Sequence, residues 1–227
     1  MKKVLLKSWQ MKSTSKRLSK LLWSVSMTKS SQITLAREIL TVLKIADPRS
    51  ILAGGAVRDW YMLDIAGRDL DFYTSFQPHR NIDQVITFIK EDLKGTNVTV
   101  LGQEEMGDNY ESMIGLKHVF EFIRDDQVCN LMIMEPCYMS NILKNFDLSV
   151  CKASFDGVEY YFDPDFLVTD ATNICFVHKD VKVDAKHVRK IADRFPRMRF
   201  VRDLDVQRRT QDKALPKFED TDEDIPW

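Results

Sequence analysis

Long apolar runs, glycine and proline are all scarce in this 227-residue sequence. No run approaches the roughly 18 consecutive apolar residues that a membrane-spanning helix needs. The opening MKKVLLKSWQ also lacks the apolar core, of roughly 7–15 residues, that marks a secretory signal. Only 8 residues are Gly and 7 are Pro, whereas 44% are hydrophobic and 30% are charged. We therefore expect one globular domain, with or without an appendage, and neither a membrane protein nor a secreted one.

Metal-binding patterns of cysteine and histidine are also lacking. The four cysteines, at 129, 137, 151 and 175, form no C-x-x-C pair and have no histidine at zinc-ligand spacing. The four histidines show no H-E-x-x-H or similar spacing, so we expect them to be exposed or hydrogen-bonded within the fold. Widely spaced cysteines of this kind favour reduced thiols in a cytoplasmic protein.

The net charge of −1 conceals a strong segregation of charge. Residues 1–30 carry eight Lys or Arg and no acidic residue, so the remaining 197 residues have a net charge of −9. This basic, Ser-rich leader suits a nucleic-acid-binding arm, an amphipathic surface helix or a targeting peptide. It is equally consistent with a weakly selected leader, because Met11 or Met27 could begin the domain. The final segment, FEDTDEDIPW, is an acidic tail that we expect to be mobile.

The hydrophobic periodicity alternates between helix and strand types, which predicts an α/β or α+β fold. Ser30 or Ser31 can cap a helix whose apolar stripe ends before Pro48. An Asp156-Gly157 pair tolerates the positive φ angles of a hairpin turn. The other expected elements are a helix over 82–94, strands over 97–102, 118–123 and 128–134 with a turn at 124–127, strands over 149–155 and 158–162, and an Arg-rich helix over 184–195 in a segment poor in strand signal.

The most informative run is ILAGGAVRDWYMLDIAGRDLDFYT, over residues 51–74. It places a short strand, a Gly-Gly turn, a helix from 56 to 66 closed by Gly67, and a second strand within 24 residues. Glycines at a strand-to-helix turn let the backbone approach an anion such as a triphosphate. On the second strand Asp69 and Asp71 are two apart, so their side chains share one face. Paired carboxylates bind Mg²⁺, and two such ions can clamp the attacking and leaving oxygens of an in-line displacement.

These motifs resemble those of a known superfamily. GGAVRD at 54–59, Gly67-Arg68 and D-L-D at 69–71 are similar to the opening GG-x-VRD, Leu-Gly-Arg and D-x-D motifs of the DNA polymerase β-like nucleotidyltransferases. The closest resemblance is to the head domain of tRNA CCA-adding enzymes and bacterial poly(A) polymerases. Two later segments fit in order: LKNFDLSVCKASFDG at 143–157 resembles RRDFT-x-NA-x-x-x-D, and FDP at 162–164 resembles I-D-P.

The resemblance implies a polymerase β-like head, with a mixed sheet flanked by helices, over 31–170. The basic leader would precede it, and a short basic helical extension with the acidic tail would follow over 171–227. It further implies Mg²⁺-dependent transfer of a nucleoside monophosphate from an NTP to a hydroxyl, with RNA, tRNA included, as the expected partner. Residues implied by position are the metal ligands Asp69 and Asp71, the further catalytic carboxylate Asp147, and the nucleotide-binding Gly54, Gly55, Arg58 and Arg68.

The sequence departs from the family pattern at several positions. Where the family has its third metal carboxylate, the matching residue is Asn130, a neutral amide that cannot act as a base. Either Asp147 or Glu135 replaces it, or only the triphosphate-side metal binds well. The Arg pair is Lys144-Asn145 here, and no E-D-x-x-R motif for base selection follows position 170. The chain is too short for a tRNA-measuring body and looks like a short, stand-alone enzyme of bacteria or phages.

Other charged residues admit two interpretations each. Asp59 is expected to be structural, offsetting the helix dipole or pairing with Arg58 or Arg68. The basic C-terminal run is either a solvated face or a track for a nucleic-acid backbone, and we favour the track, formed by Arg189, Lys190, Arg194 and Arg197. Two alternatives to RNA extension stay open: an enzyme that attaches AMP to protein side chains, as toxin-like relatives do, and a non-catalytic nucleotide- or RNA-binding module.

Overall fold

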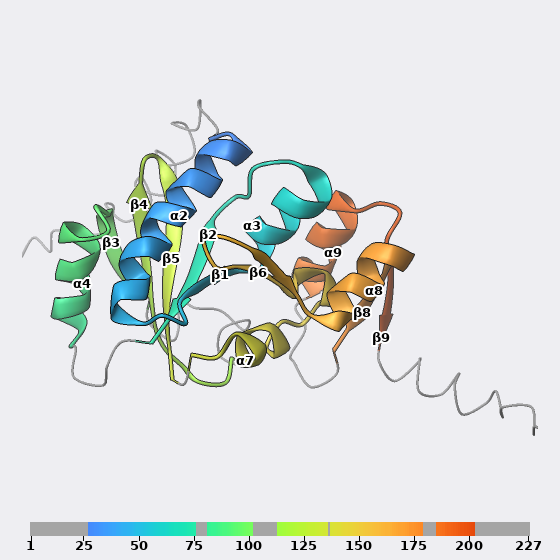
Figure 1. Ribbon diagram of the computed structural model, residues 1–227. Coiled ribbons are helices and arrows are strands. Elements are labelled where there is room, and N and C mark those ends of the chain that lie inside the picture. Colours follow the sequence, from blue (N-terminus) through green and yellow to red (C-terminus); the bar gives the residue numbers. More distant parts are fainter. Residues whose placement is uncertain (1–26, 76–80, 102–112, 136, 179–184, 203–227) are drawn as a thin grey trace, which may run out of the picture.

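The computed structural model describes residues 27–75, 81–101, 113–135, 137–178 and 185–202. Most of the basic leader and all of the acidic tail lie outside these residues. A seven-stranded sheet forms the centre of the fold, in the order β3-β4-β5-β2-β1-β6-β7 (Figure 1). Its strands are β1 (Ile51–Ala53), β2 (Leu70–Thr74), β3 (Thr96–Leu101), β4 (Leu116–Arg124), β5 (Gln127–Met134), β6 (Ala153–Phe155) and β7 (Tyr160–Phe162).

Within this seven-stranded sheet the central β2–β5 pair is parallel, and the other neighbouring strands are antiparallel. This confirms the predicted mixed sheet. Two predicted hairpins are also confirmed. Asp125 and Asp126 form the turn between β4 and β5 with φ angles of 50° and 62°, and Gly157, with φ of 99°, lies in the turn between β6 and β7.

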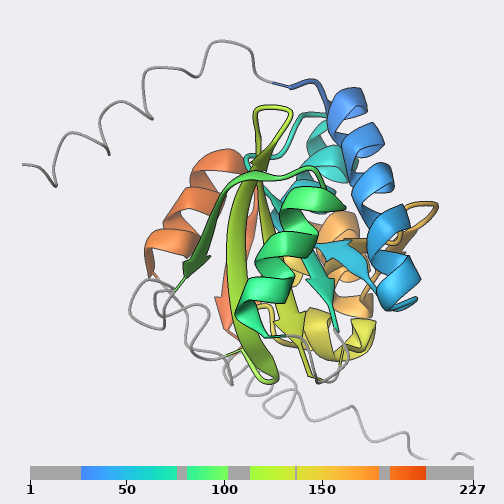
Figure 2. The same ribbon diagram turned by 90° about the vertical axis from the view of Figure 1, so that its left-hand side faces the viewer.

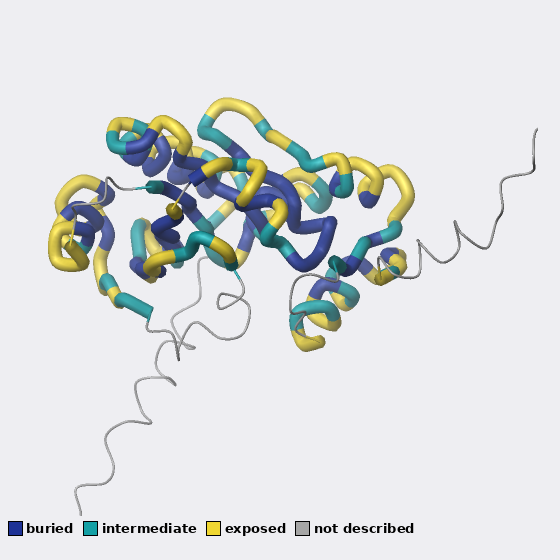
Figure 3. The backbone as a smooth tube through the Cα atoms, turned by 90° about the horizontal axis from the view of Figure 1, so that it is seen from below, coloured by how far each residue is buried: buried dark blue, intermediate teal, exposed yellow. Residues whose placement is uncertain are grey.

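Helices cover both faces of the sheet. They are α2 (Lys29–Ala46), α3 (Gly55–Arg58), α4 (Ile82–Glu91), α7 (Met139–Lys144), α8 (Pro164–Thr172) and α9 (Ala185–Arg194), with a π-helical turn over Asp59–Leu63 and a 3₁₀ turn over Ser149–Cys151. α2 and α4 lie side by side on one face (Figures 1 and 2), where Leu35, Ile39 and Phe88 join the largest buried cluster. α7 adds Ile142 and Leu143 to a separate cluster. The outer sides of the helices are exposed, whereas the central strands are buried (Figure 3).

Two predicted helix caps are wrong. The N-cap of α2 is Thr28, whose hydroxyl accepts from the Ser31 N–H, so the helix begins earlier than Ser30 or Ser31 capping implies. The second helix ends in the π-helical turn and is capped by Asp64, in the left-handed conformation with φ of 56°. Gly67 serves packing instead of capping. A Cβ there would lie 2.7 Å from the Cα of Ala56, so only glycine permits this close approach.

The C-terminal part contains more strand than its sequence indicates. β8 (Ile174–Val177) and β9 (Arg199–Arg202) form a separate parallel pair. The helix α9, which lies between them in the sequence, was predicted, but the two strands were not. A third buried cluster joins Cys175 and Ile191 of this part to Leu148 of the head. The packing therefore places α9 beside the head, and the division of the chain at 171 stays a prediction.

All four cysteines are free and buried. Among the helices that the structure describes, none has the length and hydropathy required to cross a bilayer.

Candidate active site

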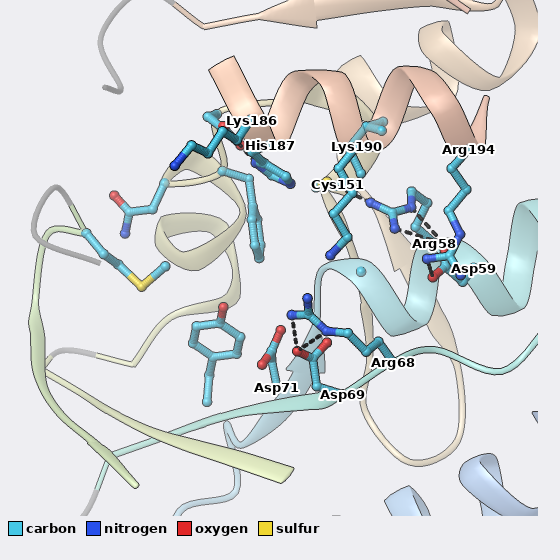
Figure 4. Close-up of a pocket in the computed structure, with 17 residues that line it drawn as sticks. Arg58, Asp59, Arg68, Asp69, Asp71, Cys151, Lys186, His187, Lys190 and Arg194 are labelled. Carbon is cyan, nitrogen blue, oxygen red and sulfur yellow. Dashed lines mark hydrogen bonds and ion pairs between the residues drawn. The ribbon is translucent and has the colours of Figure 1, made fainter. Parts of the chain in front are cut away.

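A cleft of about 380 Å³ lies between the β1–α3 turn, the start of β2 and α9 (Figure 4). Six residues that the sequence analysis singled out for catalysis or nucleotide binding line it: Gly55, Arg58, Arg68, Asp69, Asp71 and Asp147. Lys190 and Arg194, which were predicted to contact nucleic acid, also line this cleft. Segments that are far apart in the sequence are therefore brought to one place.

The Gly-Gly turn and the carboxylates are adjacent because β1 and β2 pair antiparallel, with Leu52 opposite Phe72. Gly54 has φ of 91°, a conformation that L side chains rarely adopt. A Cβ at this position would lie 4.0 Å from Asp71 Oδ2 and 3.1 Å from the ring of Phe146. The glycine therefore leaves open the space between the turn and the carboxylate.

Asp69 and Asp71 both point into the cleft towards α9 (Figure 4). The Arg68 guanidinium folds onto Asp69, with 2.9 Å between Arg68 Nε and Asp69 Oδ2. Burial and the negative charge of Asp69 raise the pKa of Asp71 to about 7. Two carboxylates that repel each other in this way are stabilised by a cation bound between them.

The partner strand places Asn130 directly beside Asp71, because the two are opposite each other in the parallel β2–β5 pair. Asn130 Nδ2 donates to Asp71 Oδ1 at 2.8 Å. A neutral amide thus occupies the site next to the carboxylate pair. Of the two residues considered as replacements for a third carboxylate, Asp147 lines the cleft, whereas Glu135 is exposed and lies 3.4 Å from Lys117.

Asp147 has a histidine partner that the sequence analysis missed. Asp147 Oδ2 lies 3.0 Å from Nδ1 of His187, on α9, and both residues line the cleft. Hydrogen bonds to Asp147 and to Cys151 raise the pKa of His187 to about 10, so the imidazole is protonated at neutral pH. The two residues are 40 positions apart, and no local pattern links them.

Asp59 is a buried carboxylate that pairs with two arginines. Its side chain is 1% exposed, and Arg58 Nε donates to its Oδ1 at 2.9 Å. Arg194 Nη1 donates to the other oxygen, Oδ2, at 2.6 Å, so Asp59 links the end of α3 to α9. Pairing with Arg58 was anticipated, but the second partner is Arg194 and not Arg68. Arg58 also donates to Cys151 Sγ, in the 3₁₀ turn, at 3.1 Å.

α9 turns one face towards the cleft, with Lys186, His187, Lys190 and Arg194 on it (Figure 4). Arg189 and Arg197 do not line the cleft, and both are exposed. A sequence signal for this face does exist. Lys186, Lys190 and Arg194 follow one another at intervals of four residues, which places them on the same side of a helix. Nucleic-acid binding by Arg189, Lys190, Arg194 and Arg197 stays a prediction.

The donor set of the cleft fits a magnesium ion bound jointly by protein and substrate. Among the described residues, no group of three or more His, Cys, Asp or Glu side chains is arranged to hold a metal by itself. Mg²⁺ commonly takes only one or two protein carboxylates, with water and substrate phosphates in its other positions. Asp69 and Asp71 supply such a pair.

Comparisons with solved structures show the fold. A CCA-adding enzyme in complex with CTP matches with a TM-score of 0.51 and 17% identity, over 75% of this chain and 43% of that one. A tRNA-processing enzyme complex matches with a TM-score of 0.48 and 15% identity, over 70% and 43% of the two chains. The Bacillus stearothermophilus CCA-adding enzyme with CTP matches with a TM-score of 0.42 and 14% identity, over 63% and 33%.

The chain thus spans less than half the length of these solved proteins. No family model matches the sequence, and no curated protein matches it. The likeness to the CTP-bound CCA-adding enzyme concerns the fold, and it agrees with the predicted mixed sheet flanked by helices.

Proposed function

We propose that this chain is a nucleotidyltransferase that moves a nucleoside monophosphate from an NTP to a hydroxyl and releases pyrophosphate. One observation carries the proposal: Asp69, Asp71 and Gly55 of the Gly-Gly turn line the same cleft, and Asp71 Oδ2 lies 4.0 Å from where a Gly54 side chain would begin. The turn would receive the triphosphate, and the carboxylates would hold Mg²⁺. The head fold supports the same proposal.

The work of the protein in such a reaction is positioning and charge neutralisation. Mg²⁺ held by Asp69 and Asp71 would neutralise phosphate charge and polarise the attacked phosphorus. Arg68 pairs with Asp69 at the edge of the same cleft, so its guanidinium lies close to the proposed position of the nucleotide phosphates. Its charge would then offset that of the nucleotide.

Removal of the proton from the attacking hydroxyl needs a group other than Asn130, because a neutral amide is not a base. Asp147 is the remaining carboxylate of the cleft that has no arginine partner within the described residues. Its ion pair with His187 fixes its position at 3.0 Å from the ring nitrogen. Asp147 is accordingly the proposed third catalytic carboxylate.

The expected acceptor is the 3′ end of an RNA, tRNA included, and the likeness in fold to a CCA-adding enzyme supports this expectation. A protein side chain that receives AMP is the alternative acceptor. A second candidate function is a binding module without catalysis, and the neutral Asn130 beside Asp71 is the observation that favours it.

Labelling of total RNA and of cell lysate with each of the four α-³²P NTPs, followed by RNase or protease digestion, identifies the acceptor. Asp69→Asn and Asp71→Asn should each reduce transfer about 100-fold or more, because charge stabilisation by a catalytic metal is worth several kcal/mol. Asp83→Asn, at an exposed position in the first turn of α4, is the matched control and should leave transfer unchanged.

Equal labelling by Asp71→Asn and the parent would show that the metal assignment is wrong. Binding of Mg²⁺-NTP without product in any acceptor pool would support the binding module. Robust release of pyrophosphate would eliminate that module.

A further inference from the structure

The cationic face of α9 lies opposite the carboxylate pair, across the cleft (Figure 4). Two of its charges already have partners in the protein. Arg194 donates to the buried Asp59 at 2.6 Å, and His187 lies 3.0 Å from Asp147. These contacts fix the helix against the head and leave little of either charge for a ligand.

Lys190 differs from these two residues. Within the part of the chain that the structure describes, its ammonium group makes no ion pair, although it lines the cleft and is directed towards Arg68 and Asp69 (Figure 4). Partial burial of its ammonium group and the positive charge of Arg68 lower the pKa of Lys190, although the residue as a whole is exposed; Arg58 and Arg194 act in the same direction. The negative charge of Asp69 acts in the opposite direction, and Arg68 already pairs with that carboxylate.

The cleft therefore contains two carboxylates, Asp69 and Asp71, and two cationic side chains, Lys190 and Arg68. A divalent cation would offset the two negative charges, and an anion would offset the two positive charges. A magnesium-bound polyphosphate supplies both charges in one ligand, and the carboxylates and the cationic side chains line the same cleft of about 380 Å³.

We infer that Lys190, together with Arg68, forms the subsite that binds the β- and γ-phosphates of the nucleotide, so that α9 is a phosphate-binding wall and not an RNA track at this position. The inference deepens the proposed function and rests on it for the identity of the ligand. Arg189, the adjacent residue on the same helix, does not line the cleft and takes no part.

Tripolyphosphate is a suitable probe because it has the phosphate chain without base or sugar. Its dissociation constant, measured by isothermal titration calorimetry with the full chain in excess Mg²⁺, should rise about tenfold in Lys190→Gln, the usual effect of losing one charged hydrogen bond. Lys190→Arg should restore binding to within about threefold, and Arg189→Gln should change it by less than about twofold. Lys190 and Arg189 are both exposed, so neither change should disturb folding, and thermal melts check this.

The dissociation constant of a single-stranded RNA is measured in parallel with the same variants. If Lys190→Gln and Arg189→Gln weaken RNA binding alike and leave tripolyphosphate binding unchanged, α9 is an RNA track and the inference is wrong. Failure of the parent protein to bind tripolyphosphate would also overturn it. Lys190-dependent binding without nucleotide transfer would instead refute the proposed enzymatic function and leave the phosphate subsite intact.

Discussion

Replacement of Asp71 by Asn should stabilise the metal-free protein while removing its proposed metal site. Burial and Asp69 raise the pKa of Asp71 from its usual 3.8 to about 7, which means that the folded protein disfavours the ionised carboxylate. An amide of the same shape removes that charge. It also keeps an oxygen that can accept the hydrogen bond from Asn130 Nδ2.

The size of the effect follows from the shift in pKa. Each pKa unit corresponds to 1.36 kcal/mol, so ionisation of Asp71 in the folded state costs at most about 4 kcal/mol at a pH well above 7. Asp71 is only partly buried, and screening by solvent reduces this to about 1–3 kcal/mol. For a chain of this size, the expected rise in Tm is about 2–12 °C.

The raised pKa of Asp71 determines how its contribution to the free energy of unfolding changes with pH. Because the pKa of Asp71 is higher in the folded than in the unfolded state, its contribution to the free energy of unfolding falls as the pH rises from about 4 through about 7. The advantage of Asp71→Asn over the parent should therefore be absent near pH 4 and complete by pH 8, in melts without divalent ions. Mg²⁺ should raise the Tm of the parent and not that of the variant. A variant that is less stable than the parent at pH 8, or indistinguishable from Asp83→Asn at every pH, would refute this reasoning.

Two further predictions concern the contacts that hold α9. Asp59→Ala should lower the free energy of unfolding in urea by about 3–5 kcal/mol, because the buried Arg58 loses its counter-ion. Glu135→Ala, which breaks the exposed pair with Lys117, should cost less than about 1 kcal/mol, and similar losses in both variants would contradict the buried network. Protonated His187 should contribute fully to the free energy of unfolding below about pH 6.5 and lose that contribution as the pH rises to about 10. Between these pH values the free energy of unfolding should therefore fall more in the parent than in His187→Asn, and parallel pH profiles would contradict the pair with Asp147.

Local signals in the sequence determine the part of the fold around the Gly-Gly turn. A strand of three apolar residues, two glycines and a D-x-D strand were enough to predict β1, the turn and β2, because the alternation of Leu70 and Phe72 with the two aspartates fixes which face is buried. The hairpin at Asp125 and Asp126 was likewise readable, because short polar residues tolerate positive φ.

Features that depend on distant contacts were not predictable in this way. Gly67 looked like a helix cap, but its role is set by the approach of Ala56, which only the folded chain reveals. The parallel pairing of β8 with β9 joins short strands separated by α9, and parallel pairs carry no hairpin signal.

The candidate site shows the same division. Asp69 and Asp71 were found because their spacing is local. His187 was missed because Asp147, its partner, comes from a different element 40 residues earlier. The basic run around α9 was recognised, but the separation of Lys190 from Arg189 needed the orientation of the helix against the cleft.

The central claim is that Asp69 and Asp71 jointly hold a divalent ion at the Gly-Gly turn. Crystals of the protein grown with Mn²⁺ and a non-hydrolysable NTP test it most directly, because Mn²⁺ can replace Mg²⁺ and is located by its anomalous scattering. We expect an anomalous peak within bonding distance of both carboxylates, with the triphosphate against Gly54 and Gly55. A peak elsewhere in the cleft, or a triphosphate bound away from these aspartates, would contradict the claim.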